Sequence, residues 1–183
     1  MSERYLGTRP LNLEPGVNTG MPVLYDNPAE VGADRIVNSI AAYELYGRSR
    51  KMPLIVVDFG TATTFDAVST AGEYLGGVIC PGIQISADAL FQRAAKLPRI
   101  DVRKPPHVIG KTTVSSMQSG LFFGYVSMVE GLVRRMRAEL GGETFCLATG
   151  GLADVIAPET DAVEAVDRDL TLTGLRMVWE RNH

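Results

Sequence analysis

Residues 58–66 have the sequence DFGTATTFD, a turn of glycine and hydroxyl residues between two apolar segments. The four residues before it, LIVV at 54–57, form an unbroken apolar run, which is typical of a strand covered on both faces. Asp58 ends that run, Gly60 lets the backbone approach a ligand closely, and Thr61 offers a hydroxyl and an N–H to phosphate oxygens. The pattern predicts a phosphate-binding turn in which Asp58 holds a cation. A hairpin turn with capping threonines is the alternative interpretation.

The motif GADR at residues 32–35 opens a second informative segment. Apolar residues follow it at helical spacing and share one face of a predicted helix: Val37, Ile40, Ala41 and Leu45. Asp34 and Arg35 therefore fall in the first turn, where adjacent side chains do not face each other and can contact different parts of one ligand. The alternative is an acid favoured by the helix dipole beside a solvated arginine.

Downstream, the pattern continues as an antiparallel meander and then as alternating helices and strands. The alternating residues 64–69, the turn at 71–73 and the apolar residues 74–79 are expected to pair with the strand at 54–57. Helices are predicted at 86–97, 115–140 and 170–181, and a short buried strand at 145–148 leads into the turn TGG at 149–151. The fold class is therefore α/β.

Composition limits the classes of partner. With 183 residues, 45% hydrophobic and 21% charged, the chain can bury one core. A net charge of −3 argues against a nucleic-acid surface, and no apolar run is long enough to span a bilayer. Cys80 and Cys146 both lie in apolar contexts, so they are expected to be buried thiols, which favours the cytoplasm.

Four motifs in order resemble type III pantothenate kinase: GADR, DFGTATTFD, YLGGVICPG at 74–82 and TGGLA at 149–153. The resemblance implies a ribonuclease H-like half of the actin and sugar-kinase superfamily, with residues 53–183 as that domain and 1–52 as a linking segment with the GADR helix. It also implies ATP-dependent phosphorylation of pantothenate to 4'-phosphopantothenate, the first step of coenzyme A biosynthesis, an activity expected to be incomplete in this chain alone. The alternative is a non-catalytic relative that acts as a regulator or dimerisation module.

The same resemblance assigns roles to individual residues. Asp34 is the expected proton acceptor, and Arg35 is expected beside transferred phosphate or a substrate carboxylate. The implied pantothenate contacts are Tyr25, Gly32, Ala33, Asp34, Arg35 and Thr113, and the implied ATP contacts are Gly60, Thr61, Gly150 and Gly151. Asp58 would bind a monovalent cation, K⁺ or NH₄⁺, and ATP would carry Mg²⁺. Packing of Tyr25, helix capping by Thr113 and a plain strand-to-helix turn at 149–151 are the alternatives.

Two further expectations concern partners. Family members open with an Asp-x-Gly-Asn-Thr loop that is not found here, so the chain is expected to be the carboxyl-terminal half, and a complementary amino-terminal chain is an expected partner. The helix at 115–140 carries more apolar residues than one core-facing side needs, including Phe122, Phe123 and Val126. A second surface of this helix is therefore expected to form a homodimer. The family resemblance also implies a dimer, and it implies that Thr113 reaches the substrate across the interface.

Overall fold

A mixed sheet forms the centre of the molecule in a computed structural model that describes residues 7, 10–14 and 17–183. The strand order is β3-β2-β1-β4-β5. The strands are β1 (Leu54–Phe59), β2 (Ala62–Val68), β3 (Tyr74–Pro81), β4 (Phe145–Thr149) and β5 (Ala165–Val166). The first three form the predicted antiparallel meander, and β4 pairs with β1 in parallel. The α/β class, with an antiparallel meander and helices, is confirmed as expected from the sequence. The predicted linking segment spans residues 1–52, and the structure does not describe ten of them, at 1–6, 8, 9, 15 and 16.

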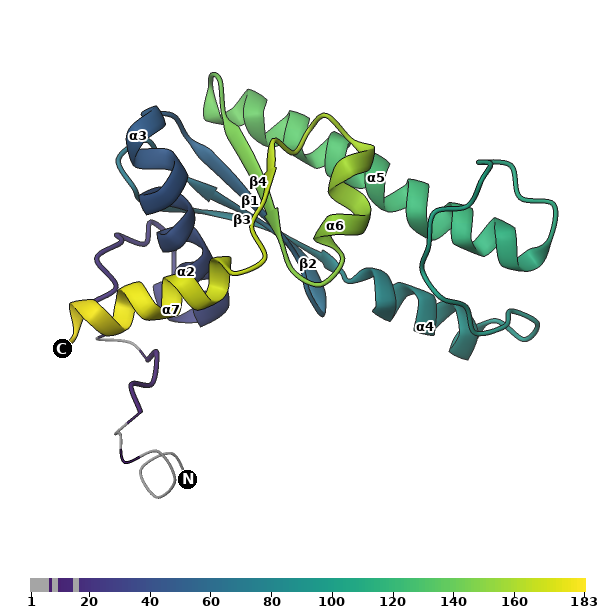
Figure 1. The fold of residues 1–183 in the computed structure, drawn as a ribbon, viewed down its shortest axis with the longest axis horizontal. Coiled ribbons are helices and arrows are strands. Elements are labelled where there is room, and N and C mark those ends of the chain that lie inside the picture. The colour runs from purple at the N-terminus through teal and green to yellow at the C-terminus, as the bar shows by residue number, and fades with distance from the viewer. Residues whose placement is uncertain (1–6, 8–9, 15–16) are drawn as a thin grey trace.

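Helices cover both faces of this sheet (Figure 1). One face is covered by α2 and α7, which pack against each other, and the other by α4, α5 and α6. The helices are α2 (Ala33–Ala42), α3 (Arg48–Arg50), α4 (Ile83–Arg93), α5 (Thr113–Leu140), α6 (Ala153–Ile156) and α7 (Leu170–Arg181). Short 3₁₀ turns lie at Pro28–Glu30 and Ala157–Glu159. Within the described residues, no helix is long and apolar enough to cross a membrane.

Alternation along β1 divides the core into two layers. Ile55 and Val57 pack toward α5, whereas Leu54 and Val56 pack toward α2 and α7. Because successive side chains of a strand point to opposite faces, the next residue, Asp58, lies on the α2 face. The same rule places Asp66 of β2 on the α2 face, since its neighbour Phe65 packs on the other side.

The helix that begins with the GADR motif departs from the predicted register. Val37, Ile40 and Ala41 are buried as predicted, but Leu45 is 45% exposed. The reason is a π-helical segment at Tyr43–Gly47, which continues α2 with a wider turn and rotates the following residues away from the sheet. The prediction that Leu45 shares the buried face is therefore wrong.

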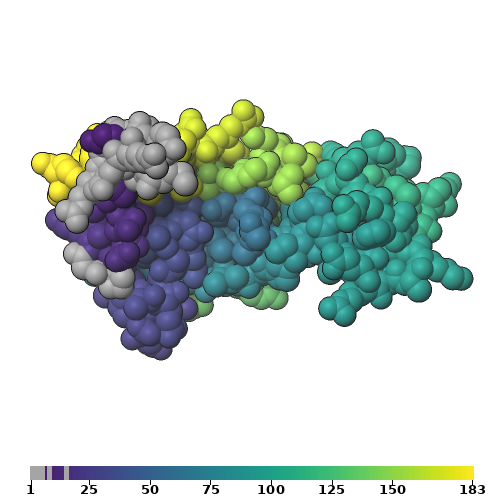
Figure 2. Space-filling model, turned by 90° about the horizontal axis from the view of Figure 1, so that it is seen from below, coloured from purple at the N-terminus to yellow at the C-terminus, as the bar shows by residue number. Residues whose placement is uncertain are grey.

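Helix α5 is the longest element, and its 28 residues span about 42 Å. Thr112 is its N-cap in a capping box with Ser115, and Gly141 ends it in the left-handed conformation. Phe122 and Val126 are buried in the core between α5 and the sheet, so the expectation that they form a second surface is wrong. Figure 2 shows α4 and the start of α5, in teal, forming one end of an elongated molecule.

Both cysteines are free thiols, as expected. Cys146 is buried in β4 and Cys80 is partly buried in β3.

Candidate functional site

Asp58 is held by a relay of hydrogen bonds from two helices. Asn38 of α2 donates its amide Nδ2 to Asp58 Oδ2 at 3.1 Å, and Thr171 of α7 donates its hydroxyl to Asn38 Oδ1 at 2.7 Å. The threonine hydroxyl thus defines which end of the Asn38 amide faces the carboxylate. Sequence reasoning missed both Asn38 and Thr171. The sequence offered only a weak signal, an asparagine next to Val37 on the predicted apolar face of this helix.

The electrostatics of Asp58 connect it to Asp34. Burial raises the pKa of Asp58, the hydrogen bond from Asn38 lowers it, and the charge of Asp34 raises it further, so the pKa lies above its ordinary value. Asp34 is exposed in the first turn of α2, and its Oδ1 accepts a hydrogen bond from the backbone N–H of Arg35 at 2.9 Å. The structure therefore brings two of the sequence-predicted acids to one side of the sheet, and no salt bridge from another described residue reaches either of them.

The predicted nucleotide turn at 149–151 passes directly beside Asp58. Thr149 of β4 is the register partner of Asp58 in β1. Gly150 has a φ of +92°, and a Cβ built on it would lie 2.5 Å from Asp58 Oδ1. Gly151 has open space around it. The close approach of backbone to carboxylate explains why glycine occupies position 150, whereas position 151 has no such constraint.

The turn that contains Gly60 and Thr61 joins β1 to β2 as a hairpin. Both residues are exposed, and Gly60 borders Asp58, since a Cβ on Gly60 would lie 3.5 Å from Asp58 Oδ1. A hairpin is expected both for a phosphate-binding turn and for a plain turn with capping threonines, so the hairpin does not distinguish the two interpretations. The assignment of Gly60 and Thr61 to ATP stays a prediction.

Arg35 faces the sheet instead of solvent. Its Nε donates to Asp66 Oδ1 at 2.7 Å, with side-chain exposures of 8% and 0% for the two residues. Tyr74 donates its hydroxyl to the same oxygen at 2.8 Å, and Thr64 donates to Oδ2 at 3.2 Å. Burial raises the pKa of Asp66, while Arg35 and Tyr74 act in the opposite direction. The alternative of a solvated arginine is wrong, and a direct contact between Arg35 and ligand stays a prediction.

The two remaining predicted substrate residues lie in different places. Tyr25 packs near the Arg35 network, with its ring 6.3 Å from that of Tyr74. Thr113 is exposed in the first turn of α5, which lies at the end of the molecule away from α2 (Figure 1). Thr112 provides the helix cap, so the capping alternative applies to that neighbour. One copy of the chain does not bring Thr113 to Asp34.

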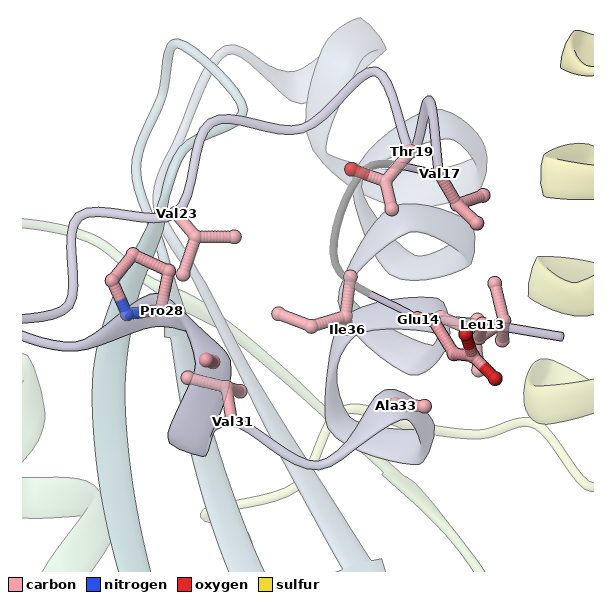
Figure 3. A pocket seen from close by; sticks show the side chains of 11 residues that line it. Leu13, Glu14, Val17, Thr19, Val23, Pro28, Val31, Ala33 and Ile36 are labelled. Atoms are coloured by element: carbon pink, nitrogen blue, oxygen red, sulfur yellow. The ribbon is translucent and has the colours of Figure 1, made fainter.

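A pocket of about 340 Å³ adjoins the first turn of α2. Figure 3 shows Ile36 pointing from α2 toward Val23 and Val31 of the preceding segment. Ala33 of the GADR motif lines the pocket, and Asp34 and Asp58 do not. Its walls are mainly aliphatic, which suits the apolar part of a ligand more than its phosphate.

Comparison with known proteins agrees with this geometry. The sequence profile of the type III pantothenate kinase family matches residues 1–135. A type III pantothenate kinase from Myxococcus xanthus is 61% identical over 183 residues, which cover 100% of this chain and 70% of that protein. One from Moorella thermoacetica is 59% identical over 182 residues, with the same two coverages. A solved structure, a Baf family transcriptional activator from Campylobacter jejuni, has the same fold with a TM-score of 0.63 at 22% identity, over 88% of this chain and 68% of that one.

The sheet, the glycine turns and the two neighbouring carboxylates, taken with these relatives, define an α/β kinase. The chain belongs to the type III pantothenate kinase family.

Proposed function

We propose that this protein transfers phosphate from ATP to the hydroxyl of pantothenate and produces 4'-phosphopantothenate for coenzyme A synthesis in the cytoplasm. The observation that carries the proposal is that the charge of Asp34 acts on Asp58 and that the backbone of Gly150 passes directly beside Asp58, in a chain of this family. Phosphoryl transfer depends mainly on positioning and charge stabilisation, and these residues offer an acceptor, an anionic anchor and bare backbone.

Asp34 is the proposed proton acceptor. It is exposed at the start of α2, and one carboxylate oxygen is already engaged by the N–H of Arg35, so the other is free to accept a hydrogen bond from the substrate hydroxyl. In a loose transition state the proton leaves late, so the carboxylate acts first by orienting the alcohol. The aliphatic pocket beside Ala33 offers room for the dimethyl carbon next to that hydroxyl.

The charges of the site support a requirement for cations. Arg35 is paired with Asp66, and neither Asp34 nor Asp58 has a salt-bridge partner among the described residues. ATP would add further negative charge to this space, which costs free energy unless cations offset it. Asp58 fits a monovalent cation, K⁺ or NH₄⁺, because Asn38 fixes one of its oxygens and the other faces the turn at Gly150.

Mg²⁺ is proposed to enter with ATP. Within the described residues, no group of three or more His, Cys, Asp or Glu side chains is arranged to hold a metal ion. Magnesium commonly binds through one or two carboxylates together with substrate phosphates, so the phosphates of ATP would supply much of its coordination. When bound, it would neutralise charge on the transferring phosphate.

A homodimer is the proposed assembly. The end of the molecule formed by α4, the following loop and the start of α5 exposes apolar side chains: Ile85, Leu90, Phe91, Val108, Ile109 and Val114. Ile109 is 82% exposed, which is unfavourable for a free surface and typical of an interface. Thr113 lies at this same end, so it would lie at or beside the interface with a second copy.

The deciding experiment follows phosphate by ³¹P NMR with ATP, Mg²⁺, K⁺ and pantothenate, using the protein expressed from its natural gene. We expect the signal of 4'-phosphopantothenate to appear, and its formation to be strongly reduced in Asp34→Asn. Calorimetric titration with pantothenate supplies the second readout. Binding of pantothenate without product would refute the kinase proposal and favour the non-catalytic regulator or dimerisation module.

A further inference from the structure

We propose that Asp66 is a positioning residue of this site, which fixes the first turn of α2 through Arg35 and thereby sets the direction in which Asp34 points. The effect of Asp66 on turnover rests on the proposed function. Its hydrogen bonds to Arg35, Tyr74 and Thr64 are independent of that function. Asp66 is the last residue of the DFGTATTFD segment, and sequence reasoning gave it no role.

Asp66 is unusual because it is a carboxylate with no exposed surface in the layer between β2 and α2. Three neighbours satisfy it: Arg35 and Tyr74 donate to Oδ1, and Thr64 donates to Oδ2. Burial and the charge of Asp66 raise the pKa of Tyr74, so the phenol keeps its proton and remains a donor. The carboxylate is therefore held from β2, β3 and α2 together.

Stability alone does not explain this arrangement. A buried ion pair is commonly no more stable than apolar residues of the same volume, because desolvation offsets the Coulomb attraction. What such a pair does supply is a defined geometry, since Nε of Arg35 meets Oδ1 at 2.7 Å and no apolar contact has that directionality.

The Arg35–Asp66 ion pair acts on the N-terminal end of α2, which no side chain caps. The N-cap of α2 is Gly32, which makes no side-chain capping hydrogen bond. Arg35 lies in the first turn of α2, and its guanidinium packs against Gly77 of β3. A Cβ built on Gly77 would lie only 2.8 Å from Arg35 Nη2. Residues 34 and 35 are about 100° apart around a helix, so fixing the direction of Arg35 also fixes the direction in which Asp34 leaves the helix. Rotation or fraying of this turn would move Asp34 relative to Asp58.

Hydrogen exchange tests the proposal without any substrate. The variants are Tyr74→Phe and Asp66→Asn, and the matched control is Tyr46→Phe, which removes a tyrosine hydroxyl that donates to Asp167 at 3.0 Å at the other end of the same helix. We expect peptides covering 33–42 to exchange roughly tenfold or more faster in Tyr74→Phe, the factor that a hydrogen bond to a charged group represents, and faster still in Asp66→Asn. Tyr46→Phe should leave the exchange of residues 33–37 unchanged. Unchanged exchange there in both network variants would overturn the proposal.

Kinetics separate positioning from a structural role. In Asp66→Asn we expect kcat per folded molecule to fall roughly 10- to 100-fold, as for other outer-sphere partners, with smaller changes in the KM values for ATP and pantothenate. If Asp66 acts through Arg35, adding Asp66→Asn to Arg35→Gln should lower kcat little further. Multiplicative losses in the double variant, or losses that only follow the folded fraction, would refute the proposal.

If Asp66→Asn does not fold, Tyr74→Phe carries the same comparison. A wild-type protein without kinase activity would refute the proposed function and leave the exchange result to decide the role of Asp66.

Discussion

Gly150 and Gly151 are adjacent glycines for which the structure predicts opposite tolerance to alanine. At Gly150 the φ of +92° disfavours any residue with a Cβ, at a cost of about 1 to 2 kcal/mol. The added methyl would also lie 2.5 Å from Asp58 Oδ1 and 2.7 Å from the backbone N and C atoms of Phe59. Overpacking of this kind costs typically about 1 to 3 kcal/mol, and the backbone atoms cannot rotate away. The sum is about 2 to 5 kcal/mol for Gly150→Ala, and about zero for Gly151→Ala.

Thermal unfolding followed by circular dichroism measures the difference. For a chain of this size the expected loss corresponds to a Tm that is lower by roughly 4 to 20 °C in Gly150→Ala. Because the methyl displaces the Asp58 carboxylate, kinase activity per folded molecule should fall as well. Gly151→Ala is the matched control, since nothing lies within 4 Å of its Cβ position. Equal stability of the two variants, within about 0.5 kcal/mol, would falsify the proposed contact between the turn and Asp58.

Four other outcomes follow from the same site. Asp34→Asn should lower kcat roughly 10²-fold with an unchanged circular dichroism spectrum, and near wild-type turnover would exclude Asp34 as the proton acceptor. Asp58→Ala should flatten the difference in activity between K⁺ and Na⁺, and an intact potassium response would refute the cation assignment. Because the pKa of Asp58 is raised in the fold, stability should fall as pH rises from 3.8 through the folded pKa. Asp58→Asn should therefore raise Tm at pH 7 but not below pH 3.8, and equal shifts at both pH values would contradict the burial argument. Light scattering at tens of micromolar should show a dimer, and a monomer would contradict the proposed interface.

Much of the fold was predictable because its signals are local. The apolar run at 54–57, the hydroxyl-rich turn and the alternation after it were enough to predict the meander, and the helix at 170–181 has the predicted bounds. The π-helical segment at Tyr43–Gly47 was not predictable, because it changes the helical period on which the expectation for Leu45 depended.

The sequence of α5 did not show how much of the helix surface is buried in the core. Phe122 and Val126 lie off the centre of the apolar stripe, which resembled a second interface. In the structure, α5 contacts the sheet along part of its length, and the loop residues Ile100 and Val102 join the same core. A long helix with neighbours on several sides needs a broad apolar surface, and only the tertiary arrangement distinguishes that from an exposed patch.

The motifs predicted which residues approach the candidate site, but not what holds them. Asp34, Asp58 and Gly150 were found because each belongs to a short segment with recognisable chemistry. Asn38, Asp66 and Thr171 act through partners that are remote in sequence, with Arg35 and Asp66 31 residues apart. No local pattern distinguishes a buried asparagine that orients a carboxylate from one that faces solvent, so these partners required the structure.

The packing of α7 on α2 has a consequence for how the protein is made. Thr171 follows Asn38 by 133 residues, so at synthesis rates of about 5 to 20 residues per second roughly 7 to 27 s separate the two on the ribosome. Strands β1 to β3 follow α2 closely in the sequence and can cover part of its apolar face, but the part that packs on α7 stays uncovered for most of that interval, and Asn38 lacks Thr171. The nascent chain therefore exposes part of an apolar helix face before α7 exists, and transiently exposed apolar surface of this kind is what chaperones bind during translation.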